Sequence, residues 1–280
     1  MRSVDLKFFD DSGAGHKLLL ELDPSDFVQA DIWGSLKAGF FYEHETSKFF
    51  VRIARPGEVF YDIGANVGYF SLLMAELMGP GGRVLAFEPN PPSCDALEAS
   101  SKRNNLAITV ERVALSDREG TATFRSNGAH DSNGAFFLGE EGGDKYEVET
   151  VTLDSYMART GYPVPKAIKI DVEGAELQVF TGADALLSNE ALEFVVCEFN
   201  VPQLHRFGTS EDELTEFMAG KGLFLYLLDH QGGMPRFVPP GVKVRMTSVA
   251  NVVFARHAAI AKYWPEVVNE CYLYTRNTAK

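Results

Sequence analysis

Short hydrophobic runs alternate with amphipathic stretches along most of the chain. The runs that predict strands occupy residues 59–64, 83–88, 108–115, 167–171 and 193–199. Apolar side chains at helical spacing predict helices at residues 65–79, 90–105 and 174–187. Strands that alternate with helices are typical of a parallel sheet covered on both faces.

Further elements flank this alternating core. Additional strands are predicted at residues 17–22, 120–125, 145–151, 222–229 and 248–256. Helices are predicted at residues 40–50 and 210–220, and Ser210 and Glu213 have the spacing of a capping box. Residues 126–144 are rich in glycine and predict a long loop, which could close over a substrate.

Composition and charge narrow the classes of function. Hydrophobic residues make up 45% of the 280 and charged residues 23%, as in globular proteins. The net charge of -13 disfavours a nucleic-acid partner, because phosphate backbones attract positive surfaces. Three well-separated cysteines, Cys94, Cys197 and Cys271, predict buried free thiols. With no signal sequence and no apolar run of roughly 18 residues, we expect a cytoplasmic protein without a membrane partner.

The strongest local motif lies between the first core strand and its helix, and reads Asp62-Ile63-Gly64-Ala65-Asn66-Val67-Gly68. Gly64 and Gly68 allow a tight turn and a close approach of backbone to a ligand, unless packing alone requires them. Asp62 suits a ligand with an ammonium group. Glu88 ends the next strand, twenty residues after Gly68, and could accept hydrogen bonds from both hydroxyls of a ribose.

Asn66 distinguishes between two kinds of adenosyl ligand. A dinucleotide fingerprint has glycine at the middle position, where the pyrophosphate approaches the backbone. Asn66 would crowd that position, so S-adenosylmethionine (SAM) is favoured over NAD. An NAD-dependent oxidoreductase remains an alternative.

Five segments in order, FYDIGANVGYFSLL, VLAFEPNP, VERVALSD, VTLDSY and IKIDVEGAELQVFTGA, resemble the FkbM-type methyltransferases over roughly residues 40–200. The resemblance implies the α/β fold of class I methyltransferases: Rossmann-like, with a mostly parallel seven-stranded sheet, an antiparallel last strand and helices on both faces. It also implies SAM as methyl donor. The acceptor would be a hydroxyl of a small metabolite, sugar or natural product.

The resemblance assigns roles by position. The methionine half of SAM would be lined by Asp62, Gly64, Asn66 and Gly68. The ribose would be held by Glu88, with Pro89 and Asn90 beside the adenosine. The adenine would be bordered by Ala114, Leu115, Ser116 and Asp117, and the transferred methyl group by Asp171 and Glu173. Many relatives carry histidine where this chain has Ala175, so a non-catalytic SAM-binding or partner module is a further alternative.

Methylation of an alcohol requires removal of a proton, so a general base is expected. The candidates are Asp171, Glu173, Glu198, His44 and His205. Asp171 is the first choice, because it ends a core strand at the edge where such sheets bind ligands. Glu173 could instead stabilise the N-terminus of the next helix. His205 lies in a predicted loop, where a surface role is the alternative.

Asp171, Glu198 and Asn200 together could bind Mg²⁺ through oxygen ligands. Nothing else in the chain requires a metal, so we predict none and expect acceptor hydroxyls there. We expect residues 1–50 to form a cap and substrate segment, 51–256 the SAM-binding domain and 257–280 a C-terminal tail. Residues 1–39 and 201–280 match no motif and are expected to determine the acceptor.

Overall fold

The structure is a computed structural model that describes residues 1–126, 136–137, 144–229, 235–244 and 249–265. Within these residues the largest sheet has eight strands in the order β13-β12-β14-β11-β10-β3-β4-β5. Its parallel strands are β3 (Val59–Ile63), β4 (Arg83–Phe87), β5 (Ile108–Glu111), β10 (Ala167–Ile170) and β11 (Phe194–Phe199).

The remaining strands complete one end of this sheet. β14 (Ala250–Ala255) is antiparallel to its neighbours β11 and β12 (Phe224–Leu227), and the two-residue β13 (Arg236–Phe237) pairs with β12. The prediction of a mostly parallel sheet with an antiparallel last strand is therefore confirmed. The short edge strand β13 adds an eighth strand to the seven expected.

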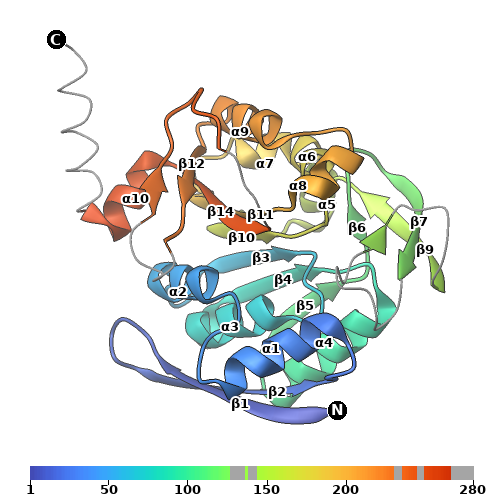
Figure 1. Ribbon diagram of the computed structural model, residues 1–280, viewed down its shortest axis with the longest axis vertical. Helices are drawn as coiled ribbons and strands as arrows, with labels where there is room; N and C mark the ends of the chain where they lie inside the picture. The colour runs from blue at the N-terminus through green and yellow to red at the C-terminus, as the bar shows by residue number, and fades with distance from the viewer. Residues whose placement is uncertain (127–135, 138–143, 230–234, 245–248, 266–280) are drawn as a thin grey trace.

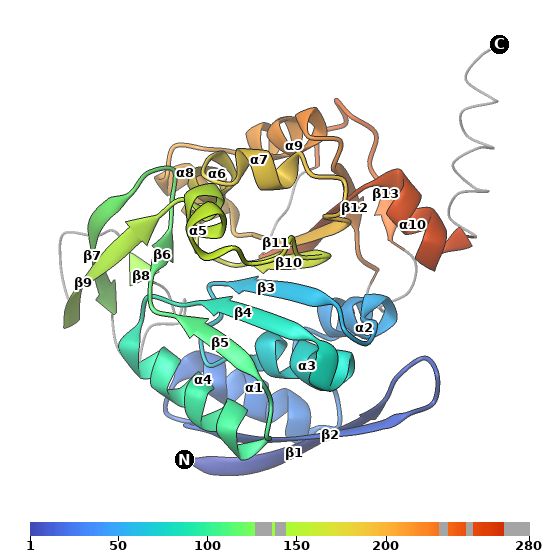
Figure 2. The ribbon, with the colours of Figure 1, turned by 180° about the vertical axis from the view of Figure 1, so that it is seen from behind.

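Helices cover both faces of the sheet (Figures 1 and 2). One face carries α1 (Phe27–Lys37), α2 (His44–Ile53), α3 (Tyr69–Met78), α4 (Pro91–Arg103) and α10 (His257–Tyr263). The other carries α5 (Leu153–Thr160), α6 (Glu176–Thr181), α7 (Asp184–Leu187), α8 (Val201–Arg206) and α9 (Glu211–Gly220). Successive strand residues point to opposite faces, so Phe60 packs in the first core and Tyr61 in the second.

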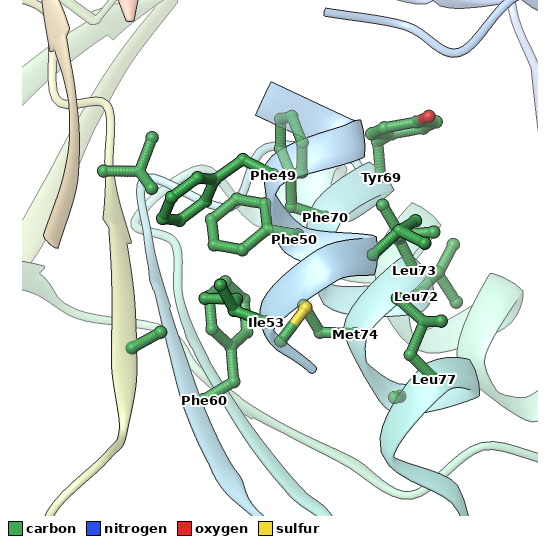
Figure 3. Packing of buried hydrophobic residues seen from close by; sticks show 14 of the residues in the cluster. Phe49, Phe50, Ile53, Phe60, Tyr69, Phe70, Leu72, Leu73, Met74 and Leu77 are labelled. Atoms are coloured by element: carbon green, nitrogen blue, oxygen red, sulfur yellow. The ribbon is translucent and has the colours of Figure 1, made fainter. Parts of the chain in front are cut away.

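Aromatic side chains fill the space between α2, β3 and α3 (Figure 3). The ring of Phe50 lies 5.2 Å from that of Phe60 and 5.5 Å from that of Phe70, both edge to face. Phe49 stacks on Trp264 at 5.3 Å, which ties α2 to the segment after α10. Helix α2 is thus fixed to the sheet along its apolar side and crosses residue 50, where the predicted cap segment ends.

A hairpin of β1 (Arg2–Phe9) and β2 (Gly15–Leu22) packs outside the helices of the first face. Val4, Leu6 and Phe8 are its buried positions on β1, an alternation that predicts a strand although only β2 was expected.

A second sheet contains β6 (Ala114–Leu115), β7 (Gly120–Ser126), β8 (Phe136–Phe137) and β9 (Asp144–Val151). The prediction of one strand over 108–115 is therefore wrong. The chain leaves the main sheet after Glu111, and β6 pairs with β9.

The single helix predicted at 174–187 is also wrong. Two short helices replace it, and a Cβ at Gly182 between them would lie 2.0 Å from the carbonyl oxygen of Ser116. This close approach to the second sheet interrupts the helix. The predicted loop at 126–144 falls mostly outside the described residues, and so does Cys271, whereas Cys94 and Cys197 are buried free thiols as expected. Among the described helices none has the length and apolar character to cross a bilayer.

Candidate active site

Strand register places five residues in one row along the carboxyl edge of the parallel strands. Ile63 pairs with Phe87 and with Ile170, and Ile170 pairs with Cys197. Glu198 pairs in turn with Asn251 on β14. The row that follows these pairs is Glu88, Gly64, Asp171, Glu198 and Asn251, with Asp171 at its centre. Neighbouring strands lie about 4.8 Å apart, so each end of the row is roughly 10 Å from Asp171.

The turn after β3 fits closely against the end of β10. Gly64 has a φ of 77°, and a Cβ there would lie 1.9 Å from the carbonyl oxygen of Asp171. Its N–H donates to the carbonyl of Phe87 at 2.9 Å. Only glycine satisfies both the backbone conformation and the approach, so this turn and Asp171 are held together.

The second glycine of the turn serves the helix that follows it. Gly68 is the N-cap of α3 with a φ of 83°, and a Cβ there would lie 2.0 Å from Cδ1 of Leu97 on α4. Asp62 is buried, and Oγ of Ser71 donates to its carboxylate at 2.6 Å. Burial raises the pKa of Asp62 to about 6 despite this hydrogen bond. The requirement for Gly68 is therefore explained by packing within the protein, and Asp62 already has a partner on α3.

Glu88 joins the turn after β3 to the turn after β4. Its two carboxylate oxygens accept the backbone N–H groups of Asn66 and Asn90, each at 2.8 Å. The side chain is buried, which raises the pKa of Glu88 to about 7. Each carboxylate oxygen can accept a second hydrogen bond, so binding of ribose hydroxyls is compatible with these contacts.

Asn90 begins α4 as predicted, but its side chain does not cap the helix backbone. Its Nδ2 donates to Oγ of Ser93 at 3.1 Å. Its Oδ1 is buried and accepts no hydrogen bond from the described residues. Pro89, between Glu88 and Asn90, is partly buried. A hydrogen-bond donor from a ligand would satisfy the free carbonyl of Asn90.

The predicted adenine border lies at the start of the second sheet. Ala114 and Leu115 are buried in β6, and the N–H of Ser116 donates to the carbonyl of Val151 at 3.0 Å. Oγ of Ser116 donates to Asp117 at 3.2 Å. The contact of this segment with an adenine stays a prediction.

Lys169 and Asp171 form a partly buried ion pair at the end of β10. Nζ of Lys169 donates to Oδ2 of Asp171 at 2.8 Å, and Lys169 is only 3% exposed. Burial alone would lower the pKa of Lys169, but Asp171 together with neighbouring carboxylates raises it well above its ordinary value. A permanent ammonium therefore stands directly beside the predicted base.

Glu173 and Glu198 lie close to Asp171. Burial and the charge of Asp171 raise the pKa of both side chains. Glu173 has a left-handed φ of 56°, and its carboxylate accepts from Nδ2 of Asn200 at 3.1 Å. The expected alternative role, at the N-terminus of the next helix, belongs to Glu176 instead, because its Oε1 accepts from the N–H groups of Val172 and Gly174.

The three carboxylates Asp171, Glu173 and Glu198 each offer an oxygen within 4.8 Å of the others, so they could hold a metal ion. This set differs from the predicted alternative, which used Asn200 in place of Glu173. Asn200 instead bonds to Glu173. The ammonium of Lys169 already partly balances the charge of the cluster, which lessens the need for a cation.

The two candidate histidines differ in their surroundings. His205 belongs to α8 rather than to a loop, its side chain is 61% exposed, and Nε2 lies 3.8 Å from Glu211. This agrees with the surface alternative. His44 begins α2 and packs against the rings of Phe40 and Phe41 at 6.3 Å. The side chain of His44 is partly buried.

Three residues of the candidate site were not predicted from the sequence: Lys169, Glu43 and Asn251. A lysine inside the apolar strand AIKID was a usable signal, because buried lysines require a partner. Glu43 and Asn251 gave no comparable signal. They meet only in the fold, where Nδ2 of Asn251 donates to Oε2 of Glu43 at 2.8 Å.

Comparison with known proteins gives one family. The family described as "Methyltransferase FkbM domain" matches residues 62–225, which is more than half of the chain. The chain is similar to "31-O-demethyl-FK506 methyltransferase FkbM" of Streptomyces tacrolimicus, with 32% identity over 46% of this chain and 61% of that protein. It is also similar to "Hexuronic acid methyltransferase AglP" of Haloferax volcanii, with 28% identity over 56% of this chain and 62% of that protein.

The chain spans about three fifths of the length of these two relatives. Among solved structures, a SAM-dependent methyltransferase of Aquifex aeolicus aligns with a TM-score of 0.43 and 13% identity, covering 84% of this chain and 98% of that one.

Proposed function

The chain belongs to the FkbM methyltransferase family, and we propose that it transfers the methyl group of SAM to a hydroxyl oxygen of a small acceptor. The observation that carries the proposal is the row at the sheet edge, which brings Glu88, the Gly64 turn and Asp171 side by side. Family membership argues against the alternative of an NAD-dependent oxidoreductase.

The residues around the turn fit an adenosyl ligand with a positive charge. Glu88 retains acceptor capacity for ribose hydroxyls, and the buried Oδ1 of Asn90 requires a donor. The clustered side-chain oxygens of Asp171, Glu173 and Glu198 are suited to the positive sulfonium and ammonium groups of SAM. When bound, SAM supplies an electrophilic methyl group on that sulfonium.

Asp171 is the residue proposed to orient the acceptor hydroxyl and to accept its proton. Lys169 holds this carboxylate at 2.8 Å through its ammonium, while burial and the charge of Asp171 raise the pKa of Glu173 and Glu198. A carboxylate held by an ion pair at the carboxyl edge of the sheet is positioned to orient a hydroxyl and to accept its proton. Glu173 is proposed as a second ligand of the acceptor, whereas the exposure of His205 makes it the weakest of the catalytic candidates.

The acceptor class follows from the names of the relatives. They are described as acting on a natural product and on a hexuronic acid, and a third relative, from Sinorhizobium fredii, is called "2-O-methyltransferase NoeI". We therefore propose a sugar or natural-product hydroxyl. Residues 1–50 as a substrate segment and a cytoplasmic location stay predictions.

The test is methyl transfer from methyl-labelled SAM to a panel of glycosides and macrocyclic alcohols. We expect release of S-adenosylhomocysteine (SAH) and a labelled methyl ether. Asp171→Asn is expected to lower kcat by about 100-fold or more with SAH affinity retained, and the exposed Asp95→Asn serves as control. A labelled methyl group on nitrogen or carbon of the acceptor would contradict the proposal. Absence of SAH release with every acceptor would also contradict it and would favour a non-catalytic module.

A further inference from the structure

Glu43 enters the site from the N-terminal part of the chain, outside the family match at 62–225. It is the N-cap of α2 and has the left-handed backbone angles φ 41° and ψ 66°. This conformation is uncommon for a residue with a Cβ. Because the aromatic packing of α2 fixes the helix, the position of the Glu43 carboxylate is fixed relative to the sheet.

Asn251 meets Glu43 from the other end of the chain, also outside the family match. It lies on β14 directly opposite Glu198 on β11, and its Nδ2 donates to Oε2 of Glu43 at 2.8 Å. Its Oδ1 is buried and accepts no hydrogen bond from the described part of the chain. The amide is thus held in place by Glu43, with its acceptor oxygen still available.

Glu43 lies near the same charged groups that surround Asp171, the predicted base. Burial raises the pKa of Glu43, while the ammonium of Lys169 lowers it and Asp171 raises it. Glu43 in turn contributes to the raised pKa of Glu198. Glu43, Asp171, Glu173 and Glu198 therefore all lie near the same buried ammonium, that of Lys169.

The row at the sheet edge separates two sides of this region. Glu88 follows β4, two strands from β10 in one direction, and Asn251 lies on β14, two strands away in the other. If the adenosyl group binds over β3 and β4, as the proposed function requires, the space toward β11 and β14 is left for the acceptor.

We infer that Glu43 and Asn251 form the acceptor side of the pocket and position an uncharged, hydroxyl-rich molecule while excluding anionic ones. The inference rests on the proposed function. Sugar-like hydroxyls can donate to the Glu43 carboxylate and to Oδ1 of Asn251. A carboxylate on the acceptor would lose its water beside Asp171, and the buried ammonium of Lys169 is already paired with Asp171. Burial of this additional charge without a partner is unfavourable. The acceptor would therefore differ from the hexuronic acid in the name of the Haloferax relative.

The test measures binding of two matched probes, methyl glucoside and methyl glucuronoside, to the full chain saturated with SAH. Ligand-observed NMR gives the affinity of each probe. We expect the neutral glucoside to bind at least tenfold more tightly than the anionic glucuronoside. Glu43→Gln is expected to weaken glucoside binding and to narrow this difference, with SAH affinity changed less than threefold. Asn251→Ala should weaken binding of the glucoside in the same way. Lys48 is an exposed residue of α2, and Lys48→Gln should leave the affinities for both probes unchanged.

Four results would overturn the inference. They are equal binding of the two probes, tighter binding of the glucuronoside, no probe binding to a chain that binds SAH, and wild-type probe binding by both variants. A chain that fails to bind SAH would instead contradict the proposed function on which the inference rests.

Discussion

The ammonium of Lys169 lies 2.8 Å from the carboxylate of Asp171, at the point where β10 leaves the sheet. The two residues are two positions apart at the end of β10, so local chain geometry brings their side chains together without a contribution from a distant loop. The pair places an ammonium in a region where burial and the charge of Asp171 raise the pKa of Glu173 and Glu198. The ion pair of Lys169 and Asp171 therefore determines where positive charge lies within the acidic cluster.

Removing the ammonium should destabilise the chain. Lys169→Met leaves the buried carboxylates of Asp171 and Glu43 without their cation, and we expect a loss of roughly 3–5 kcal/mol of unfolding free energy. The double variant Lys169→Met, Asp171→Asn should lose less than the sum of the two single variants. Urea unfolding of all four chains measures the coupling, and additivity within about 0.5 kcal/mol would show that the pair does not interact.

Glu88 should hold two turns together even in the absence of a ligand. Glu88→Gln keeps one acceptor oxygen but places an NH₂ group against the N–H of either Asn66 or Asn90. We expect a loss of about 1–3 kcal/mol in unfolding free energy, the usual effect of a buried donor without a partner. Asp95→Asn, at an exposed carboxylate of α4, is the matched control. Equal stability of the two variants would remove Glu88 from this structural role.

Alanine substitutions at Gly64 and Gly68 should both lower stability, but only the loss at Gly68 should be partly restored by a second substitution. Gly64→Ala places a methyl group on the backbone oxygen of Asp171, which cannot rotate away, so severe loss of stability is expected. Gly68→Ala meets the side chain of Leu97, and Gly68→Ala with Leu97→Ala should regain part of the loss.

Thermal unfolding measures these variants, with Gly34→Ala as control. Gly34 lies in α1, and a Cβ there has no neighbour within 4 Å. Its substitution should be neutral or stabilise by up to about 1 kcal/mol, as alanine does in a helix interior. Wild-type stability of Gly64→Ala would contradict the close approach of the turn to Asp171.

Stability of the ligand-free chain should fall as pH rises from about 4 to about 7. Burial raises the folded-state pKa of Asp62 from 3.8 to about 6, and those of Glu88 and Glu176 from 4.5 to about 7. Across this window the folded chain retains protons that the unfolded chain has released, so deprotonation favours unfolding. Urea titrations at about pH 5.5 and about pH 8 should give the larger unfolding free energy at the lower value.

Glu176→Gln removes one of these groups and should make the pH dependence shallower. An unfolding free energy that rises with pH over the same window would show that these carboxyls are ionised without cost in the folded chain.

The sequence predicted the elements whose patterns are local. The turn at Gly64 and the strand of Asp171 were recognised because glycines, apolar runs and acidic strand ends lie within a few residues of one another. The helix expected at 174–187 failed because Gly182 is packed against Ser116, a contact distant in sequence. Glu43 and Asn251 are separated by about two hundred residues, so only the fold could reveal their hydrogen bond.

Calorimetric titration of the wild-type chain with SAH tests the central claim most directly. If the Gly64 turn and Glu88 bind one adenosyl ligand beside Asp171, the titration should show one site per chain with a dissociation constant on the order of micromolar. NADH, whose pyrophosphate Asn66 would crowd, should give no heat in the same experiment. A folded chain that binds NADH, or that gives no heat with SAH up to about millimolar concentration, would contradict the claim.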